Sequence, residues 1–357
     1  MSPAKAQRRR AEQPQEETAE STGSGTATLA EIARAAGVSA PTVSKVLNGR
    51  ADVAPATRTR VEELLLRHGY RRRRAESSRS PLLDLVFHEL ESAWAMEVIR
   101  GVENVARDSG LSVVLSESDG RLTPGQSWLD RVLARRPHGV ILVLSGLEPA
   151  QRAQLASRDI PFVVMDPAGD PGDEVPSVGA TNWQGGLAAT RHLLELGHRR
   201  IAVLGGPPRM MCSRARIDGY RAALEAAGVE VDPELIREGD FHHETGHTVG
   251  RELLRLPDRP TAVFTGNDLQ ALGLYEAARE LGLRVPEDVS VVGFDDLPLT
   301  RWVAPPLTTV RQPLTEMAEA AARMVLDLSR GERPAVPRIE LATSMVVRAS
   351  TAPPAAG

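Results

Sequence analysis

The chain lacks the features that would tie it to a disulfide framework, a membrane or a secretory route. Cys212 is the only cysteine among 357 residues, which excludes an internal disulfide and a metal site built from cysteines. No apolar run approaches the roughly 18 residues that a membrane span needs. The N-terminus lacks the apolar segment of a signal peptide. These absences predict a cytoplasmic protein that makes no contact with a membrane.

Two motifs of common enzymes are also missing. The chain has no G-x-x-x-x-G-K-[ST] phosphate-binding loop and no G-x-S-x-G nucleophile turn. His243 and His247, in the segment HHETGH, have a spacing that can hold a metal on a helix, but a third ligand is lacking and a solvated turn is the alternative. The lone Gly205-Gly206 turn is a weak phosphate signal. We therefore expect a protein that is not an enzyme and uses no cofactor and no metal.

Charge is divided unevenly along a chain whose net charge is −4. Residues 28–80 hold 11 Lys and Arg against 5 Asp and Glu, a charge of +6, whereas residues 81–357 hold 28 against 38, a charge of −10. A basic segment supplies the sequence-independent attraction to phosphates that DNA binding needs. Residues 1–27 are polar and predict a disordered tail. The pattern indicates a basic DNA-binding head on an acidic body.

Residues 28–48 have the pattern of two short helices joined by a glycine turn. Thr28 and Glu31 form a capping box, Gly37 suits a turn with positive φ, and Ser39 can cap the second helix. The apolar stripe of the first helix is Leu29, Ile32, Ala33 and Ala36, and that of the second is Val43, Val46 and Leu47. A helical hairpin in a core is the alternative, but helices of small residues bury little area. The pattern favours a helix-turn-helix, which lays its second helix in the DNA major groove.

A longer motif runs through residues 38–70. It has the form V-S-x-x-T-V-S-R-V-L-N followed by a third helix that ends near G-Y. The matching residues are Val38, Ser39, Thr42, Val43, Ser44, Val46, Leu47, Asn48, Gly69 and Tyr70, with Lys45 in place of the usual Arg. This segment resembles the DNA-binding domain of the lactose-repressor (LacI/GalR) family of bacterial transcription regulators. The resemblance covers about residues 28–348.

Beyond residue 82, short apolar runs alternate with helical patterns, which is typical of βαβ units and parallel sheets. The alternation runs from LLDLVF to PFVVMD and restarts at residues 183–196, so two doubly wound subdomains are predicted, with a ligand cleft at the carboxyl ends of their strands. The resemblance implies the same fold class: an all-α helix-turn-helix head followed by an α/β body of two doubly wound parallel-sheet subdomains, similar to periplasmic sugar-binding proteins. It also implies three crossings between the subdomains, which we place near Ala180, near residues 305–312 and near Gly331.

The domain prediction follows from these patterns. Residues 1–27 are a disordered tail, 28–70 the helix-turn-helix domain, 71–81 a basic linker, 82–348 the effector-binding and dimerisation domain, and 349–357 a tail. Within the effector domain, the first subdomain comprises about residues 82–180 and 312–330. The second comprises about residues 181–305 and 331–348.

Polar residues follow several predicted strands directly. Asp166 follows FVVM, Asn267 follows AVFTG, and Asp295 follows SVVGF, while Arg216 lies in SRARIDGY. Carboxylates and amides bridge neighbouring sugar hydroxyls, Arg donates a fork of hydrogen bonds, and an aromatic ring covers the apolar ring face. These residue types predict a cleft for a polyhydroxylated ligand.

The resemblance assigns ligand roles to the same positions. Its motifs R-x-R-x-x-G-[FYW], N-D, G-[FY]-D-D and P-P-L-T-T-[IV]-x-Q all occur here, and it places aromatic walls at Phe241 and Trp94. The predicted effector site is Trp94, Asp166, Arg216, Phe241, Asn267, Asp295 and Gln312. Structural roles remain open for four residues: Asp268 and Asp296 can act as caps, Arg214 as a salt-bridge residue, and Trp94 as part of the core or a dimer interface.

In the family, the first, second and sixth positions of the recognition helix read DNA, and here these are Ala40, Pro41 and Lys45. The first two can make only apolar contacts, for example with a thymine methyl, whereas Lys45 can donate to guanine O6 and N7. Other residues are expected to position the helix on phosphates. The predicted DNA-binding set is Thr28, Ser39, Ala40, Pro41, Thr42, Ser44, Lys45, Asn48, Tyr70, Arg71, Arg72, Arg73 and Arg74.

The linker RRRRAESSRSP departs from the family pattern. Family members carry a hinge helix whose leucine wedges into the minor groove, but residues 71–81 contain no leucine. Arg71 to Arg74 and Arg79 can enter the minor groove directly, where the negative potential favours arginine. A flexible basic tether is the alternative.

Together these patterns predict a sequence-specific DNA-binding transcriptional regulator: a repressor that a small sugar-like effector releases from its operator. The expected partners are near-palindromic double-stranded operator DNA and a second copy of the chain in a homodimer. Two alternatives remain, a regulator whose ligand is a co-repressor and a sugar-binding carrier or sugar-acting enzyme on the same body. The sign of the ligand's effect on DNA binding distinguishes a co-repressor from an inducer. Deletion of residues 1–80 distinguishes a carrier or enzyme, which would keep its function, from a repressor, which would lose it.

Overall fold

The computed structural model describes residues 29–47, 53–67, 79–90, 93–118 and 120–355. The chain forms two compact units, Met1–Ala75 and Glu76–Gly357. No helix in the described ranges is both long enough and apolar enough to span a bilayer.

In its described residues, the first unit holds three helices, α1 (Leu29–Ala36), α2 (Ala40–Leu47) and α3 (Pro55–Arg67). Gly37 has a φ of 67° and turns the chain between α1 and α2, as the sequence predicts. Ser39 Oγ accepts a hydrogen bond from the Thr42 amide at 3.3 Å, which confirms the predicted cap of α2. The buried residues of this small core are Ile32, Ala33, Ala36, Val43, Val46, Val53 and Val61. The predicted stripes of α1 and α2 therefore face one another and α3.

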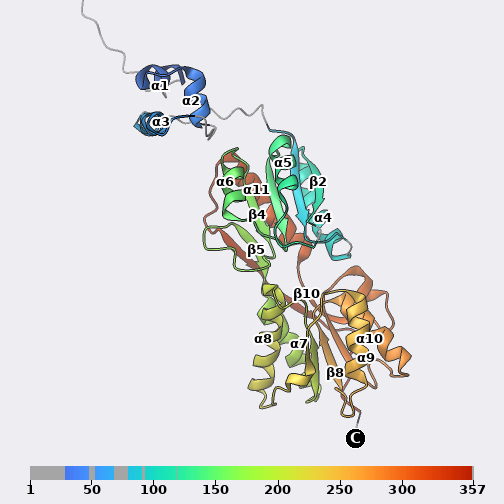
Figure 1. Ribbon diagram of the computed structural model, residues 1–357. Helices are drawn as coiled ribbons and strands as arrows, with labels where there is room; N and C mark the ends of the chain where they lie inside the picture. The colour runs from blue at the N-terminus through green and yellow to red at the C-terminus, as the bar shows by residue number, and fades with distance from the viewer. Residues whose placement is uncertain (1–28, 48–52, 68–78, 91–92, 119, 356–357) are drawn as a thin grey trace, which may run out of the picture. The chain divides into compact units, whose positions relative to one another are not determined.

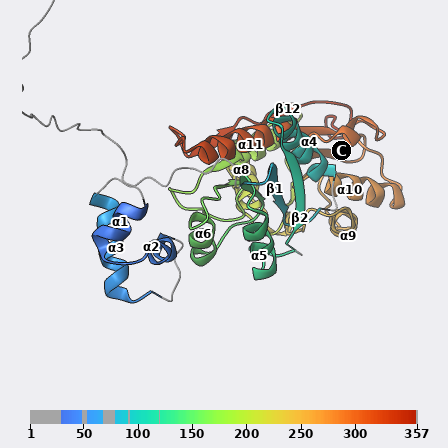
Figure 2. The same cartoon turned by 90° about the horizontal axis from the view of Figure 1, so that it is seen from above.

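The first lobe of the second unit is a six-stranded sheet in the order β11-β5-β4-β3-β1-β2, in which every pairing is parallel. Its strands are β1 (Leu82–Phe87), β2 (Ser112–Glu117), β3 (Gly139–Val143), β4 (Phe162–Met165), β5 (Ser177–Ala180) and β11 (Arg338–Leu341). Its helices are α4 (Ala93–Asp108), α5 (Gln126–Arg135), α6 (Pro149–Ala156) and α11 (Leu314–Arg330). Helices α4 and α11 cover one face, and α5 and α6 cover the other (Figure 2).

The second lobe repeats this architecture, with the strand order β12-β10-β9-β8-β6-β7. Its strands are β6 (Ile201–Leu204), β7 (Ile236–Arg237), β8 (Ala262–Thr265), β9 (Ser290–Asp295), β10 (Thr308–Arg311) and β12 (Ser344–Val346), and only β12 is antiparallel to its neighbour. Helices α7 (Asn182–Glu195) and α8 (Met211–Ala226) cover one face, and α9 (His243–Leu254) and α10 (Asp268–Glu280) cover the other (Figure 1). The body thus consists of two doubly wound lobes, which is the predicted fold class.

The chain passes between the lobes three times. It leaves the first sheet after β5 at Ala180, returns after β10 at residues 312–313, and passes back between β11 and β12 at residues 342–343. The third crossing was predicted near Gly331, and that position is wrong, because residues 338–341 pair with β5 in the first sheet. Gly331, with a φ of 86°, only ends α11.

Residues 349–352 also differ from the predicted tail. Ser350 is fully buried, and its Oγ accepts from the Thr308 amide and donates to the Val291 carbonyl. The Val291 amide donates to the Ser350 carbonyl at 2.9 Å. This segment therefore belongs to the second lobe, where it closes the hydrogen bonding around β9 and β10.

Candidate functional site

A cavity of about 140 Å³ lies between the lobes, at the carboxyl ends of strands from both sheets. Its lining residues are Phe87, His88, Glu89, Trp94, Val143, Leu144, Asp166, Pro207, Arg209, Met210, Cys212, Arg216, Asp240, Phe241, His242, Asn267, Leu269 and Asp295. Six of the seven predicted effector residues are among them. The seventh, Gln312, is buried behind the cavity at the second crossing.

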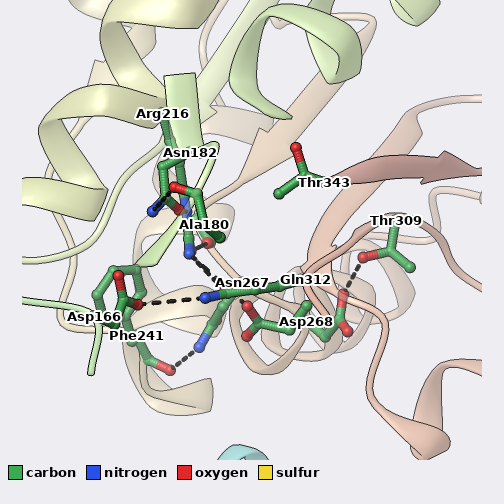
Figure 3. Close-up of polar contacts among 12 residues, drawn as sticks. Asp166, Ala180, Asn182, Arg216, Phe241, Asn267, Asp268, Thr309, Gln312 and Thr343 are labelled. Atoms are coloured by element: carbon green, nitrogen blue, oxygen red, sulfur yellow. Dashed lines mark hydrogen bonds and ion pairs between the residues drawn. The ribbon is translucent and has the colours of Figure 1, made fainter. Parts of the chain in front are cut away.

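Arg216 lies on the floor of this cleft, a name we use for its buried lining residues Asp166, Arg216 and Asp295. Its Nε donates to Asn182 Oδ1 at 2.8 Å, its Nη1 to the Gly266 carbonyl at 2.5 Å, and its Nη2 to Gln312 Oε1 at 3.1 Å (Figure 3). The guanidinium carbon lies 3.6 Å from the centroid of the Phe294 ring, a cation–π contact. Its charge is therefore fixed in place by four partners while its edge faces the cavity.

The backbone of α8 holds Arg216 in this position because two glycines let α7 and α8 touch. A Cβ on Gly186 would lie 2.1 Å from the Arg216 carbonyl oxygen, and a Cβ on Gly219 would lie 2.2 Å from the Trp183 carbonyl oxygen. Only glycine permits such backbone-to-backbone packing.

Two buried carboxylates share the single cation. Asp295 Oδ1 lies 3.9 Å from Arg216 Nη2 and accepts no hydrogen bond from any described residue. The pKa of Asp295 is raised to about 7, chiefly because burial disfavours the charged form; the carboxylate of Asp166 adds to this rise, and Arg216 opposes it. Burial likewise raises the pKa of Asp166, against the influence of Arg216 and of hydrogen bonds from Gln312 and Asn182. The floor thus carries a carboxylate oxygen that lacks a donor.

Asn267 and Asp268 have structural partners as well as a place near the cleft. Asn267 Oδ1 caps α10 by accepting from the Gln270 amide at 2.9 Å, and its Nδ2 donates to the Phe241 carbonyl at 2.8 Å. Asp268 accepts from the Leu297 amide and the Thr309 hydroxyl, does not line the cavity, and is fully buried. The structural alternative therefore describes Asp268, whereas Asn267 caps α10 and also lines the cavity.

Four cleft residues have backbones in the positive-φ region that favours glycine: Leu144 (49°), Asp166 (49°), Phe241 (74°) and Asp295 (111°). Three of them directly follow or end a strand, and each lines the cavity. Such strain persists only where the surrounding structure enforces it, and it clusters at binding sites. Its concentration around one cavity makes this cleft the candidate functional site of the body.

Sequence reasoning missed several cleft residues. Asn182 begins α7 and binds Arg216, but no strand pattern or motif singled it out. Glu89, Arg209 and His242 stand at the rim, where an ordinary loop composition gives no signal. Cys212 is 4% exposed, and burial raises the pKa of its thiol to about 12.

The recognition helix α2 presents its predicted base-reading side chains outward. Ala40, Pro41 and Lys45 are exposed, and Thr42 and Ser44 are half-buried. Ser39 and Thr42 join their hydroxyls at 2.8 Å, so part of their polarity serves the cap. The remaining predicted DNA-binding residues lie outside the described ranges: Thr28, Asn48, Tyr70, Arg71, Arg72, Arg73 and Arg74.

Arg79 does not match its predicted place in the minor groove. Its guanidinium donates to the Ser329 carbonyl at 2.7 Å and to the Asp159 carbonyl at 2.6 Å, so it anchors the start of the body. Residues 68–78 and the question of a hinge helix lie outside the described ranges.

Residues 243–247 spell His-Glu-x-x-His, a zinc-binding spacing, and begin helix α9. His243 Nε2 lies 3.5 Å from Glu276 and His247 Nε2 lies 3.1 Å from Glu280, both on α10. No three His, Cys, Asp or Glu side chains in the described ranges form a group suited to a metal. The motif therefore serves the packing of α9 on α10.

A helix-turn-helix unit and a two-lobed body with a buried polar cleft define the class: a DNA-binding regulator with a ligand-binding domain. Residues 28–73 match the model of bacterial regulatory proteins of the lacI family, and residues 190–351 match that of the periplasmic binding protein-like domain. The chain belongs to the lacI family, and it is a transcriptional regulator.

Curated relatives and solved structures extend over nearly the whole chain. The HTH-type transcriptional repressor CytR of Escherichia coli (strain K12) is 33% identical over 91% of this chain and 96% of its own length. The HTH-type transcriptional repressor PurR of Erwinia tasmaniensis is 34% identical over 91% and 97%.

Among solved structures, the transcriptional regulator CelR in complex with cellobiose has a TM-score of 0.69 at 35% identity, covering 91% of this chain and 99% of its own. The lac repressor dimer bound to operator and the anti-inducer ONPF has a TM-score of 0.67 at 29% identity, covering 92% and 100%.

Proposed function

We propose that this protein is a repressor that binds a near-palindromic operator as a homodimer and is released by a small, neutral, polyhydroxylated effector, most simply a sugar. One observation carries the effector part. Asp295 lines the cavity between the two lobes, and its buried Oδ1 accepts no hydrogen bond from any described residue. A ligand hydroxyl supplies that hydrogen bond, while the Arg216 fork and Asn267 fix neighbouring hydroxyls.

The charges of the cleft favour a neutral effector over an anionic one. Its described lining carries the carboxylates of Glu89, Asp166, Asp240 and Asp295 against the guanidinium groups of Arg209 and Arg216. Arg216 already donates to three protein acceptors, and two of its five N–H groups are left for ligand hydroxyls. A phosphorylated sugar on the floor would place its charge beside Asp166 and Asp295, which costs free energy in a buried site.

Aromatic side chains complete the proposed sugar site. Phe241 lines the cavity beside Arg216 at 5.8 Å from its guanidinium carbon, and Trp94 lines it from the first turn of α4. An aromatic face covers the apolar face of a sugar ring. CelR, a solved relative, is named as a cellobiose complex, which supports a saccharide for this cleft as well.

For the DNA head, we infer that Ala40, Pro41 and Lys45 contact base edges and that the other residues of the predicted set contact phosphates. The exposure of these three side chains on α2 supports this assignment. The names of the relatives CytR and PurR, both repressors, support repression as the outcome.

Release follows from the connection of the lobes at their crossings. Gln312 accepts from Arg216 of the second lobe and donates to Asp166 of the first at 3.4 Å, so an effector on these residues biases how the lobes rotate. Rotation changes the spacing of two paired heads. Because the coupling is reciprocal, operator DNA weakens effector binding by the same factor.

The test is selection of DNA by the full chain from a randomised duplex library. The proposal predicts enrichment of one near-palindromic sequence with two half-sites. A protein with residues 1–80 deleted is the control and enriches nothing. Enrichment of a single, non-repeated half-site would contradict the dimeric repressor, and the absence of any enriched sequence would contradict the function.

A further inference from the structure

Among the described residues, two contacts join the lobes across the cleft, away from the crossings. On one side, the Met211 amide of α8 donates to the Ala168 carbonyl at 2.8 Å. On the other, His242 Nε2 lies 3.2 Å from Glu89 Oε2. Glu89 follows β1 in the first lobe, and His242 precedes α9 in the second. Only the second contact is made by side chains, and only it can change with pH.

The Glu89–His242 pair stands at the rim of the cavity. Both residues line it, and their side chains are 43% and 44% exposed, whereas Arg216 and Asp295 on the floor are 4% exposed. A ligand on the floor would leave through the gap that this pair spans. The pair is therefore placed to control how readily the cleft opens.

We propose that Glu89 and His242 are positioning residues that hold the cleft shut over the effector, and that they hold it more firmly when His242 carries a proton. That the enclosed molecule is an effector rests on the function proposed above. The closure of the cleft by this pair does not depend on that function. A protonated imidazole forms a charge-assisted bond to the carboxylate, which the neutral ring makes only weakly.

The groups around His242 leave Glu89 as its acidic partner. Asp240 accepts from the His242 amide and the Thr245 hydroxyl, so its carboxylate serves the local turn. His88 Nε2 lies 3.8 Å from the other oxygen of Glu89, and its Nδ1 contacts the Arg121 carbonyl.

Further charged groups near the rim are Arg209, which lines the same cavity, and Glu244, which lies in the first turn of α9. Asp166 and Asp295 lie on the floor, below the rim pair. His88 competes with His242 for the same carboxylate, and Arg209 adds positive charge to the rim. The closing contact is therefore one partly exposed pair with several ionisable neighbours, so we expect its strength to be modest.

Cys212 provides a reporter that needs neither effector nor operator. It is the only cysteine and is 4% exposed; it lines this cavity and a second one beside β5 and α7, and we expect a thiol reagent to reach it faster when the cleft opens. Variants are compared at the same pH, because the thiolate fraction then cancels.

The experiment measures the rate of Cys212 modification in the full chain, Glu89→Gln and His242→Gln between pH 5.5 and 8. Both variants should react about two- to five-fold faster than the unsubstituted protein at pH 5.5, as expected for a half-exposed ion pair. The difference should be smaller at pH 8, because a neutral imidazole bonds the carboxylate only weakly. His243→Gln is the matched control, because its pair with Glu276 has similar exposure but stays within one lobe.

Equal rates for all four proteins at pH 5.5 would overturn the proposal, as would a difference that persists unchanged at pH 8 or one shared by His243→Gln. None of these outcomes depends on DNA or on a sugar. Failure of the closure proposal is thus distinguishable from failure of the proposed repressor function.

Discussion

One arginine lies close to two buried carboxylates on the floor of the cleft. This excess of acidic groups affects the pKa values of both carboxylates. Arg216 lies between Asp166 and Asp295, and both carboxyl groups have raised pKa values because burial disfavours their charge. Both groups therefore bind a proton at a higher pH than they would in an unfolded chain.

The residue Asp295 gives a stability prediction with a defined sign. Its pKa rises from 3.8 in the unfolded chain to about 7 in the folded one. The stabilisation that its proton binding adds to the folded state is therefore fully present below pH 3.8 and is lost as the pH rises through about 7. Asp295→Asn should remove this loss. The free energy of unfolding of the variant minus that of the unsubstituted protein should therefore be about 2–4 kcal/mol larger at pH 8 than at pH 4.5. Urea unfolding at both pH values measures the difference. An unchanged difference would show that Asp295 stays ionised.

Lys45 gives a specificity prediction. Lys45→Ala should weaken binding to the selected operator by about 1–3 kcal/mol and relax the preference at one base position in each half-site. Arg34→Ala on α1 is the charge-matched control, and it should weaken operator and random DNA alike. Fluorescence anisotropy with both duplexes separates the two effects. An equal loss on operator and random DNA for Lys45→Ala would assign it to a phosphate.

At the scale of elements, most helices and strands of the body could be predicted, because apolar runs of strand length alternate with helical periods. The strand β1, for example, has the predicted bounds 82–87. The strand β11 could not be predicted, since its residues Arg338–Leu341 are mostly exposed and give no apolar run. This is why the third crossing was misplaced at the end of α11.

The contact of α7 with α8 links packing to the site. Gly186→Ala would drive a methyl group into the Arg216 carbonyl, which is backbone and cannot swing aside. We expect a loss of about 2–3 kcal/mol in the free energy of unfolding, together with a displaced Arg216. Gly179→Ala in β5 is the control, because a Cβ there meets nothing within 4 Å. Denaturant unfolding of both variants provides the measurement, and equal stabilities would contradict the close contact.

The site itself was predictable only in part. Residues that follow strands converge at one sheet edge, so Asp166, Asn267 and Asp295 could be expected in one cleft. Contacts between segments distant in sequence could not, because spacing carries no information about which loops face each other across two lobes. The pairing of Glu89 with His242 and the bond of Asn182 to Arg216 are of this kind.

At the scale of the whole molecule, function depends on a basic head and an acidic two-lobed body acting together. Residues 28–80 carry a charge of +6 and residues 81–357 a charge of −10, so only the head attracts DNA. The cleft between the lobes is lined by carboxylates, an amide and the hydrogen-bonded Arg216, which we propose bind a neutral ligand. We therefore expect that binding of an effector in the cleft changes the affinity of the head for its operator.

The most direct measurement is the affinity of the full chain for DNA from upstream of its own gene, with and without a panel of neutral sugars and their phosphorylated counterparts. We expect the chain to bind this DNA tightly and one neutral sugar to weaken its affinity for the DNA by about five- to 150-fold. The phosphorylated form of that sugar should have no effect. Binding that appears only when a ligand is added would show a co-repressor. Tight, sequence-specific binding that no neutral sugar alters, but a phosphorylated one does, would contradict the proposed chemistry of the cleft.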